Sequence, residues 1–275
     1  MKPKIIKTIQ EMQNTKLSGK VGFVPTMGFL HKGHLSLIRA AKRDCDTVVV
    51  SIFVNPSQFG PNEDLSQYPR DFVQDVKLLS GLEVDYIFFP TEKEMYPDDF
   101  KTWVNVDKIT TILCGKSRPI HFQGVTTIVA KLMNIVNPDM MFLGEKDFQQ
   151  IVVLEQMIRD LNFKTKIVRC PLIREKDGLA MSSRNKYLSE KGRQEALCLY
   201  LSLLQAKSEF QNGNFDSLSM KKKMEKLIHK NNGIIDYIEF VDPTSLESKA
   251  KVRKGDRVLL AVWIEDTRLI DNMEI

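Results

Sequence analysis

The chain has 275 residues, long enough for one large domain or two modest ones, and 43% hydrophobic with 27% charged residues indicates a globular protein with an extensive core. No apolar run approaches the roughly 20 residues that would span a bilayer, and the N-terminus lacks the apolar region and cleavage site of a secretion signal. The net charge of +5 is mild and would suit a small polyanionic substrate. We therefore expect a cytoplasmic protein that binds neither a membrane nor nucleic acid.

Short apolar runs alternate with helical patterns over roughly the first 170 residues. The pattern predicts strands at 20–25, 47–54, 86–89, 140–143 and 166–170, and helices at 33–43, 71–80, 125–136 and 148–161. Strands that alternate with helices imply a parallel sheet with right-handed crossovers. We predict a doubly wound, Rossmann-like α/β domain over residues 1–184.

The pattern changes after about residue 185. Two amphipathic helices are expected at 189–211 and 217–230, followed by strands at 234–241, 257–264 and 267–271. A tight turn at Glu265 and Asp266 would join the last two strands. These elements predict a smaller α+β domain over residues 185–275, after a polar boundary stretch at 175–188.

Cysteine and lysine patterns carry little functional signal. The four cysteines are far apart and include no CxxC pair, which favours reduced thiols over a zinc site or a disulfide framework. Three consecutive lysines at 221–223 fall in a predicted helix, where a solvated face is favoured over a nucleic-acid-binding arm.

Two common nucleotide motifs are absent. No GxGxxG follows the first predicted strand. Gly115, Lys116 and Ser117 imitate the end of a phosphate-binding P-loop, but Thr110 stands where that motif requires a glycine.

The turn after the first strand, at 25–34, reads Pro-Thr-Met-Gly-Phe-Leu-His-Lys-Gly-His. His31 and His34 are three residues apart at a helix start, so they share a face. Gly33 would let the backbone approach a ligand, and free amides there would favour an anion. Two surface histidines remain an alternative, whereas zinc is disfavoured because no third ligand has a recognisable spacing.

This turn resembles the HxGH signature of the nucleotidyltransferase superfamily, which includes class I aminoacyl-tRNA synthetases. The preceding Pro-Thr-Met-Gly narrows the resemblance to the pantothenate synthetase family. Segments 51–70, 118–150 and 174–189 agree with that family and follow its order. HxGH alone is a weak signal, but the four segments together are specific.

The resemblance implies an AMP-forming ligase that activates pantoate with ATP and joins it to β-alanine through a pantoyl adenylate. It also implies Mg²⁺ that accompanies ATP rather than a protein metal site, and a homodimer. A nucleotidyltransferase that stops after adenylylation and a non-catalytic nucleotide sensor are the alternatives.

Neutral side chains are the candidates for binding pantoate. Amides such as Asn55, Gln58 and Gln150 can hydrogen-bond hydroxyl and carboxylate groups without adding charge. The resemblance places Gln58 and Gln150 on pantoate, and we expect Met27 beside both substrates. A solvated loop is the alternative for Asn55 and Gln58.

Two further segments are candidates for ATP. In the family, the glycine and aspartate that correspond to Gly144 and Asp147 hold the ribose, and the lysine at Lys146 reaches the phosphates. Asp147 could also serve only as a helix N-cap. The string Met181-Ser182-Ser183-Arg184 resembles the superfamily's KMSKS signature, with arginine in place of the second lysine, and its hydroxyls and guanidinium could bind polyphosphate. A serine-rich interdomain linker is the alternative.

These arguments give two sets of expected residues. The catalytic set is His34, Lys146, Ser182, Ser183 and Arg184. The ATP-binding set is Pro25, Thr26, Met27, Gly28, His31, His34, Gly144, Lys146, Asp147, Met181, Ser182, Ser183 and Arg184. Arg118, His121, Tyr68 and Arg70 are expected near the cleft without defined roles.

Overall fold

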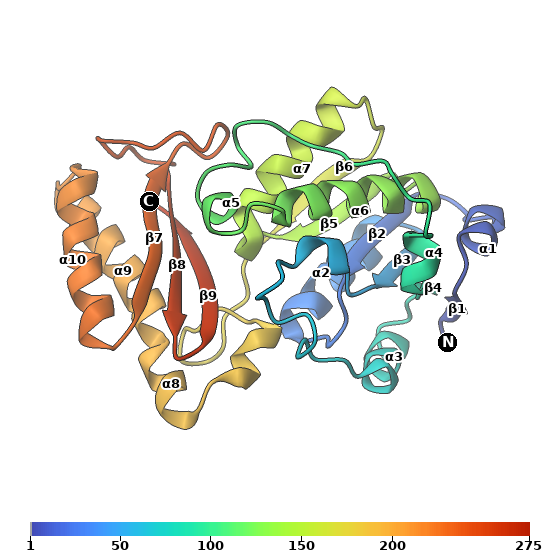
Figure 1. The fold of residues 1–275 in the computed structure, drawn as a ribbon, viewed down its shortest axis with the longest axis horizontal. Coiled ribbons are helices and arrows are strands. Elements are labelled where there is room, and N and C mark those ends of the chain that lie inside the picture. The colour runs from blue at the N-terminus through green and yellow to red at the C-terminus, as the bar shows by residue number, and fades with distance from the viewer. Residues whose placement is uncertain (1) are drawn as a thin grey trace.

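The structure, a computed structural model, describes residues 2–275 and has two parts, each with its own sheet (Figure 1). The N-terminal part is built on six parallel strands in the order β1-β4-β3-β2-β5-β6. These are β1 (Lys4–Ile6), β2 (Val21–Thr26), β3 (Thr47–Ile52), β4 (Tyr86–Phe88), β5 (Met140–Gly144) and β6 (Lys166–Cys170). Helices lie on both of its faces, as the sequence predicts for a doubly wound domain.

Alternate residues along each central strand supply the two cores. Phe23 and Val49 face the side covered by the long helix α6 (His121–Val136). Val24 and Val50 face the side covered by α2 (Lys32–Asp44) and by α3 (Phe72–Ser80). The remaining elements of this part are α1 (Ile9–Asn14), α4 (Glu92–Met95), α5 (Cys114–Ser117), α7 (Phe148–Asp160) and the 3₁₀ turns η1 (Pro56–Gln58) and η2 (Glu145–Asp147).

The strand order reverses at β2. The chain runs from β2 to β3 and β4 on one side, then returns to place β5 on the other side of β2. Loops that leave two such strands diverge, and ligands of open α/β sheets bind in the crevice between them. The turn after β2 and the turn after β5 therefore border the expected binding crevice.

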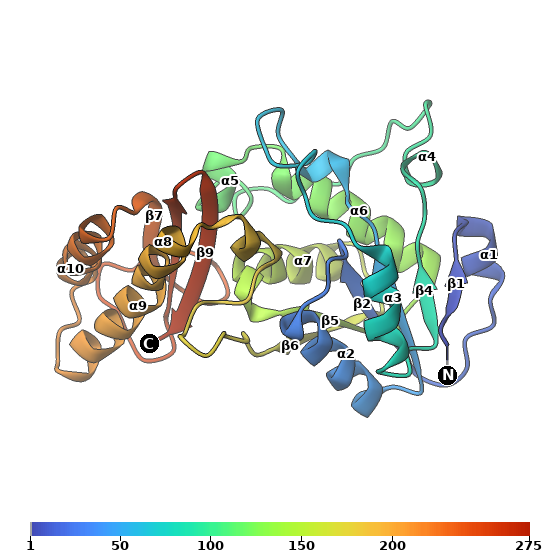
Figure 2. The same cartoon turned by 90° about the horizontal axis from the view of Figure 1, so that it is seen from below.

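The C-terminal part contains an antiparallel sheet in the order β7-β8-β9, with bounds Ile234–Val241, Arg257–Ile264 and Thr267–Glu274. Helices α9 (Leu197–Gln211) and α10 (Ser217–Lys230) cover its outer face, whereas β9 lies toward the N-terminal part (Figures 1 and 2). A further apolar cluster, which includes Phe148 and Leu259, joins the two parts.

The segment between the two parts contacts both. Leu179 packs in the C-terminal core, and Ser183 in the 3₁₀ turn η3 (Ser183–Tyr187) donates a hydrogen bond to the Phe29 carbonyl of the N-terminal part. The domain boundary after residue 184 stays a prediction. In the described part of the chain, no helix is long and apolar enough to cross a membrane.

Several predicted elements differ from those observed. The single helix expected at 189–211 is wrong: α8 (Glu190–Glu195) and α9 are separate, because a tighter bond from the Leu199 N–H to the Ala196 carbonyl interrupts the α-helical pattern. Strand β1 and helix α1 are too short to give a periodic signal and were missed. Helix α6 starts four residues before the predicted helix, and β9 extends three residues beyond the predicted strand.

Candidate active site

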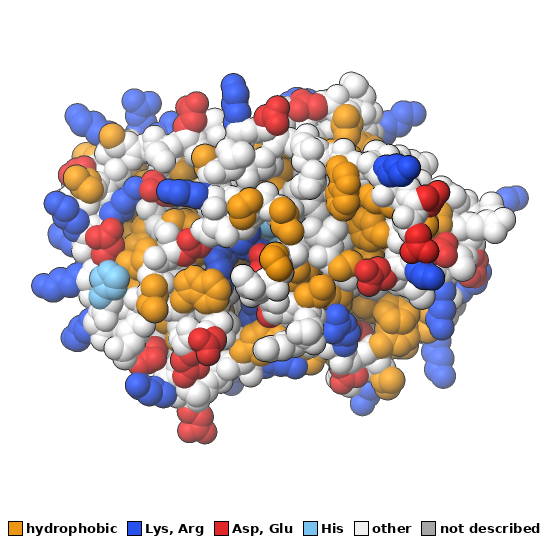
Figure 3. Space-filling model, viewed as in Figure 1, with side chains coloured by type: hydrophobic (Ala, Val, Ile, Leu, Met, Phe, Trp, Pro, Cys, Tyr) orange, Lys and Arg blue, Asp and Glu red, His pale blue; other side chains and the backbone are white. Residues whose placement is uncertain are grey.

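A cavity of about 1050 Å³ lies between the two parts, beside the carboxyl ends of β2 and β5. Figure 3 shows the hollow from one side, with lysine or arginine side chains visible inside it. The cavity lining includes segments from the N-terminal part, the η3 segment and the C-terminal sheet. The site is therefore shared by both parts of the molecule.

A sharp turn after β2 orients the HxGH segment. Gly28 and Phe29 both adopt left-handed backbone conformations, with φ of 80° and 51°. The buried carboxylate of Asp75 stabilises the turn by accepting the Phe29 N–H at 2.9 Å and the Leu30 N–H at 2.7 Å. Burial raises the pKa of Asp75. Asp75 comes from α3, so the local sequence of the turn gives no signal for it.

Both histidines accept backbone N–H groups at the start of α2. Nδ1 of His31 accepts the Gly33 N–H at 3.1 Å, and Nδ1 of His34 accepts the His31 N–H at 3.3 Å. The His31 and Gly33 amides are therefore already paired, so these two are not the free backbone donors expected at this helix start. Because Nδ1 accepts in both rings, the proton of each neutral ring is assigned to Nε2, which is left to donate to a ligand.

Burial keeps both rings neutral. It lowers the pKa of His31 from 6.5 to about 4 and that of His34 to about 3, with a smaller contribution from nearby Lys146. Gly33 is required between them, because a Cβ at that position would lie 2.8 Å from the His31 ring. The histidines are thus neutral hydrogen-bond donors at near-neutral pH.

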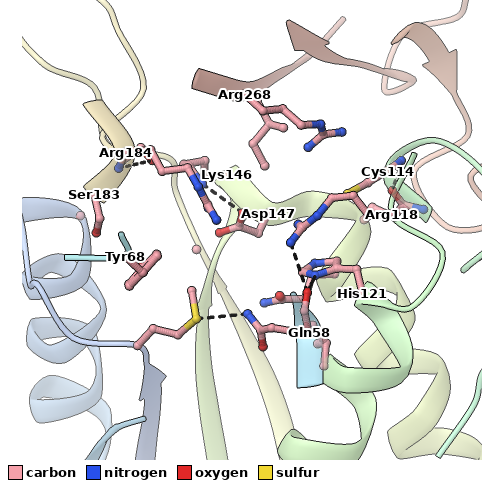
Figure 4. A pocket seen from close by; sticks show the side chains of 18 of the residues that line it. Gln58, Tyr68, Cys114, Arg118, His121, Lys146, Asp147, Ser183, Arg184 and Arg268 are labelled. Carbon is pink, nitrogen blue, oxygen red and sulfur yellow. Dashed lines mark hydrogen bonds and ion pairs between the residues drawn. The ribbon is translucent and has the colours of Figure 1, made fainter. Parts of the chain in front are cut away.

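Two cations with carboxylate partners form one side of the cavity, here called the cationic wall (Lys146, Asp147, Arg184 and Asp64). Lys146 Nζ lies 3.0 Å from Asp147 Oδ1. Arg184 makes a bidentate pair with Asp64, with N–O distances of 2.9 and 2.8 Å. Figure 4 shows Lys146 and Arg184 close together on this side. Although burial opposes ionisation of Asp147, the ammonium of Lys146 holds its pKa below the usual value.

The serines next to Arg184 fix its loop. Ser182 Oγ accepts the Arg184 N–H at 3.2 Å, and Ser183 Oγ donates to the Phe29 carbonyl at 3.3 Å. A Cβ atom at position 33, if the residue were not glycine, would lie 3.7 Å from the Met181 Cβ, so this loop packs against the HxGH turn. The HxGH turn and the Met181–Arg184 string therefore meet, although they are separated by about 150 residues in the sequence.

The opposite side of the cavity, here called the amide wall (Met27, Asn55 and Gln58), carries no charge. Gln58 lies beside Met27, with its Nε2 3.1 Å from the methionine sulfur (Figure 4). Asn55 Nδ2 donates to Gln58 Oε1 at 3.1 Å. That bond fixes the orientation of the Gln58 amide, so its NH₂ group faces Met27 and the cavity.

Asn55 itself is 1% exposed and has its amide fully used. Its Nδ2 also donates to the Gly124 carbonyl at 3.1 Å, and its Oδ1 accepts from the Ser57 and Tyr96 hydroxyls, each at 2.9 Å. Its geometry supports a role in orienting Gln58. A direct contact of Asn55 with pantoate stays a prediction.

Arg118 and His121 both hold the backbone of Gln58. Arg118 pairs with Glu63 at 3.0 Å and donates to the Gln58 carbonyl at 3.2 Å. His121 Nδ1–H donates to the same carbonyl at 3.0 Å, and burial, aided by Arg118, lowers its pKa to about 3. Figure 4 shows the three side chains together. The structure thus gives Arg118 and His121 a supporting position that the sequence left undefined.

All of the expected site residues except Gly28 line the cavity, including Gln150 from α7. Gly28 lies behind the lining, with its N–H 3.2 Å from Thr26 Oγ1. Tyr68 lines the cavity, while Arg70 lies outside the lining and donates to the Tyr68 and Leu65 carbonyls.

Comparison with known proteins identifies the family. The profile described as Pantoate-beta-alanine ligase matches residues 4–274. The chain belongs to the pantoate–β-alanine ligase family. A pantothenate synthetase of Caldicellulosiruptor bescii is 53% identical over 277 residues, with 98% of each chain covered.

Solved structures agree in fold along the whole chain. The pantothenate synthetase of Thermus thermophilus superposes with a TM-score of 0.96 at 42% identity, covering 98% of this chain and 99% of that one. The pantoate-β-alanine ligase of Francisella tularensis, complexed with β-γ ATP and β-alanine, gives a TM-score of 0.85 at 39% identity, covering 99% and 97%. The doubly wound fold with a smaller second domain is confirmed.

Sequence reasoning missed the contribution of the C-terminal sheet. Arg268 in β9 lines the cavity and pairs with Asp236 at 2.6 Å, and Asp236 accepts from Ser117 Oγ at 2.5 Å. This bridge joins the two parts across the cavity mouth. Ser117 of the Gly-Lys-Ser string is thus bonded to a carboxylate of the other part.

Among the described residues, the cavity lining forms no preorganised metal-binding site. Within residues 2–275, no group of three or more histidine, cysteine or acidic side chains is arranged to hold a metal ion. The carboxylates of Asp64, Glu63 and Asp147 are each paired with a cation of the chain. The donor set therefore favours an anion over a bare divalent cation.

Proposed function

We propose that this protein condenses pantoate with β-alanine at the expense of ATP, by way of a pantoyl adenylate, releasing pyrophosphate and AMP. The observation that supports this most directly is one cavity with a cationic wall facing an amide wall. The first suits a polyphosphate, and the second suits a neutral or singly charged hydroxy acid. Family membership agrees with this assignment of substrates.

In the first step, a pantoate carboxylate oxygen attacks the α-phosphorus of ATP, and the bond to pyrophosphate breaks. We propose that Lys146 and Arg184 stabilise the charge that develops on the phosphates, while Nε2–H of His34 donates to a phosphate oxygen. A carboxylate is already nucleophilic, so positioning and charge stabilisation supply most of the catalysis. A neutral histidine suits this role because Nε2–H can donate while the Nδ1 lone pair already accepts a backbone N–H.

ATP would extend from the cationic wall onto neighbouring residues of the cavity lining. The nucleotide would lie against Pro25, Thr26, Met27 and His31, with Gly144 and Asp147 near the ribose. Met181, Ser182 and Ser183 would follow the phosphates with Arg184. The Gly28 turn contributes indirectly, by shaping the backbone between Met27 and His31.

Pantoate would lie on the amide wall. Gln58 is held with its NH₂ group toward the cavity, and Gln150 lines the same cavity from α7. We propose that both amides hydrogen-bond pantoate, and that Met27 contacts both substrates. In the second step, the neutral amine of β-alanine attacks the acyl carbon, loses a proton as the amide forms, and displaces AMP.

The acyl adenylate is prone to hydrolysis, so water must be kept away. We propose that residues 185–275 act as a lid over the N-terminal domain, because Asp236, which is paired with Arg268, already accepts a hydrogen bond from Ser117 of that domain. Mg²⁺ is proposed to arrive with the phosphates of ATP, since the paired carboxylates of the chain offer no cage of their own. A homodimer and a cytoplasmic location are further parts of the proposal.

The test is AMP formation from Mg-ATP and pantoate, with and without β-alanine, together with pantoate-dependent ATP–pyrophosphate exchange. We expect exchange without the amine, and equal amounts of AMP and pantothenate once it is added. Exchange with no amine-dependent AMP release would instead identify an adenylyltransferase. Absence of both reactions in folded protein that binds ATP would refute the ligase.

A further inference from the structure

A buried side chain of the other domain binds the backbone of the turn that carries Lys146. Asn272 in β9 donates through Nδ2 to the backbone carbonyls of Glu145 at 2.8 Å and Lys146 at 3.0 Å. An amide nitrogen has two hydrogens, so both are used. Asn272 is 5% exposed, which shields these bonds from water. Figure 1 shows β9 as the strand of its sheet that lies toward the N-terminal domain.

The orientation of the Asn272 amide is determined by its partners. Its Oδ1 accepts from Arg257 Nη1 at 2.7 Å. A reversed amide would place oxygen against two carbonyls and an NH₂ group against a guanidinium, so hydrogen bonding permits one orientation. The guanidinium of Arg257 lies 4.1 Å from the ring centre of Phe148, the first residue of α7, and is itself buried. The hydrogen bond between Arg257 and Asn272 therefore joins two buried side chains.

The residue before Asn272 holds the second phosphate-facing segment. Asp271 makes a bidentate pair with Arg174, with N–O distances of 2.6 and 2.9 Å. Arg174 begins the segment that leads to Ser182 and Arg184. Two consecutive residues of β9 therefore bond to the Lys146 turn and to the start of the segment that carries Arg184.

We propose that Asn272 is a positioning residue for adenylation: it fixes the backbone at Glu145 and Lys146 so that the Lys146 ammonium meets the phosphates. This inference rests on the proposed function. A lysine side chain is flexible, so where its charge can reach depends on where its backbone is held. A displacement of about 1 Å can cost on the order of 10² in rate.

The variant that separates the contacts is Asn272→Asp. It has nearly the same shape and keeps an oxygen for Arg257, but it replaces the donor that faces the two carbonyls. We expect the kcat of pantoate-dependent ATP–pyrophosphate exchange to fall by about 10 to 10²-fold. The pantoate KM should change by less than about twofold, because Gln58 lies on a separate loop. Normal kcat in the folded variant would overturn the proposal.

A double-mutant cycle distinguishes positioning of Lys146 from general destabilisation. In a Lys146→Ala background, Asn272→Asp should have little further effect on kcat, because the group that it positions is gone. If the full loss persists there, Asn272 does not act through Lys146. The matched control is Asp256→Asn. The side-chain carboxylate of Asp256 is buried in the C-terminal part, away from the cavity, and accepts the Arg253 N–H at 2.8 Å. This substitution should lower the melting temperature and leave kcat unchanged.

Hydrogen–deuterium exchange gives a readout that does not require activity. Peptides covering 145–150 should exchange faster in Asn272→Asp than in the parent protein, and unchanged protection would overturn the proposal. If the parent protein itself shows no ATP–pyrophosphate exchange, the proposed function fails. Hydrogen–deuterium exchange would still show whether Asn272 holds the backbone at Glu145 and Lys146. Should Asn272→Asp be unstable, Asn272→Ala removes the same donor without adding a charge and is judged by the same measurements.

Discussion

The cationic wall and the amide wall solve the problem of a buried polar surface in different ways. Lys146 and Arg184 are each paired with a carboxylate of the chain, because an unpaired charge in a partly buried cleft is costly. Phosphate oxygens would have to compete with those carboxylates. On the amide wall, a neutral hydrogen bond from Asn55 orients the Gln58 side chain. The cationic wall would exchange its carboxylate partners for phosphate oxygens, whereas the amide wall is already oriented for its ligand.

This difference predicts where each substitution will act. Groups on the cationic wall should matter most when charge moves during adenylation, so they should change kcat. Groups on the amide wall meet an acid whose contacts change little, so they should change KM. Four measurements, from the largest expected effect to the smallest, would break or sharpen the comparison.

Lys146→Ala should have the largest effect. We expect the kcat of ATP–pyrophosphate exchange to fall by roughly 10²–10³, as for loss of a pre-organised transition-state donor. The matched control is Lys116→Ala, which removes the exposed lysine of the P-loop-like string and should leave exchange near normal. A near-normal rate in folded Lys146→Ala would remove that residue from the mechanism.

Arg184→Ala should reduce the same kcat by about 10 to 10²-fold, because the guanidinium is one donor among several on that wall. Arg184→Lys should recover only part of the loss, since an ammonium cannot reproduce the planar, two-pronged contact. Steady-state exchange kinetics at saturating pantoate would compare them. Full recovery in Arg184→Lys would show that only the charge matters.

Gln58→Ala should mainly weaken pantoate binding. Loss of one neutral hydrogen bond, worth about 0.5–1.5 kcal/mol, would raise the pantoate KM about 3–10-fold with kcat nearly unchanged. Asn55→Ala should also raise this KM and lower the melting temperature, because it leaves buried partners unpaired. An unchanged pantoate KM in Gln58→Ala would count against the assignment of the amide wall.

The smallest effect at working pH concerns the buried histidines. Burial lowers the pKa of His34 and His121 from 6.5 to about 3, so the unfolded chain binds more protons than the folded one below pH 6.5. Their contribution to stability is present above pH 6.5 and is lost as the pH falls toward 4. Urea unfolding should show stability that declines as the pH falls from 6.5 to 4.5.

His121→Asn tests the source of that decline, because it keeps a short donor but removes the titrating ring. Its stability should depend less on pH between 6.5 and 4.5 than that of the parent protein. Nitrogen NMR of the imidazoles should in addition show His31 and His34 neutral, with the proton on Nε2, from pH 6 to 9. A midpoint near 6.5 for either ring would contradict the buried, neutral histidines.

The sequence by itself predicted the doubly wound domain, because buried parallel strands such as β3 are continuous β-branched runs and the helices between them are long and amphipathic. It also identified most residues of both walls, because the HxGH turn, the Lys146 turn and the Arg184 loop are local strings. Short elements such as β1, and the break between α8 and α9, depend on hydrogen bonds and packing that no short window of sequence contains.

Only the tertiary structure decided how those strings are supported. Asp75 reaches the HxGH turn from 45 residues away, and Asn272 reaches the Lys146 turn from more than 120 residues away. Each is a buried polar residue that acts far from its own place in the sequence, so neither forms a local motif. Sequence patterns record local periodicity and turn chemistry, whereas buried hydrogen bonds between distant segments exist only after the chain has folded.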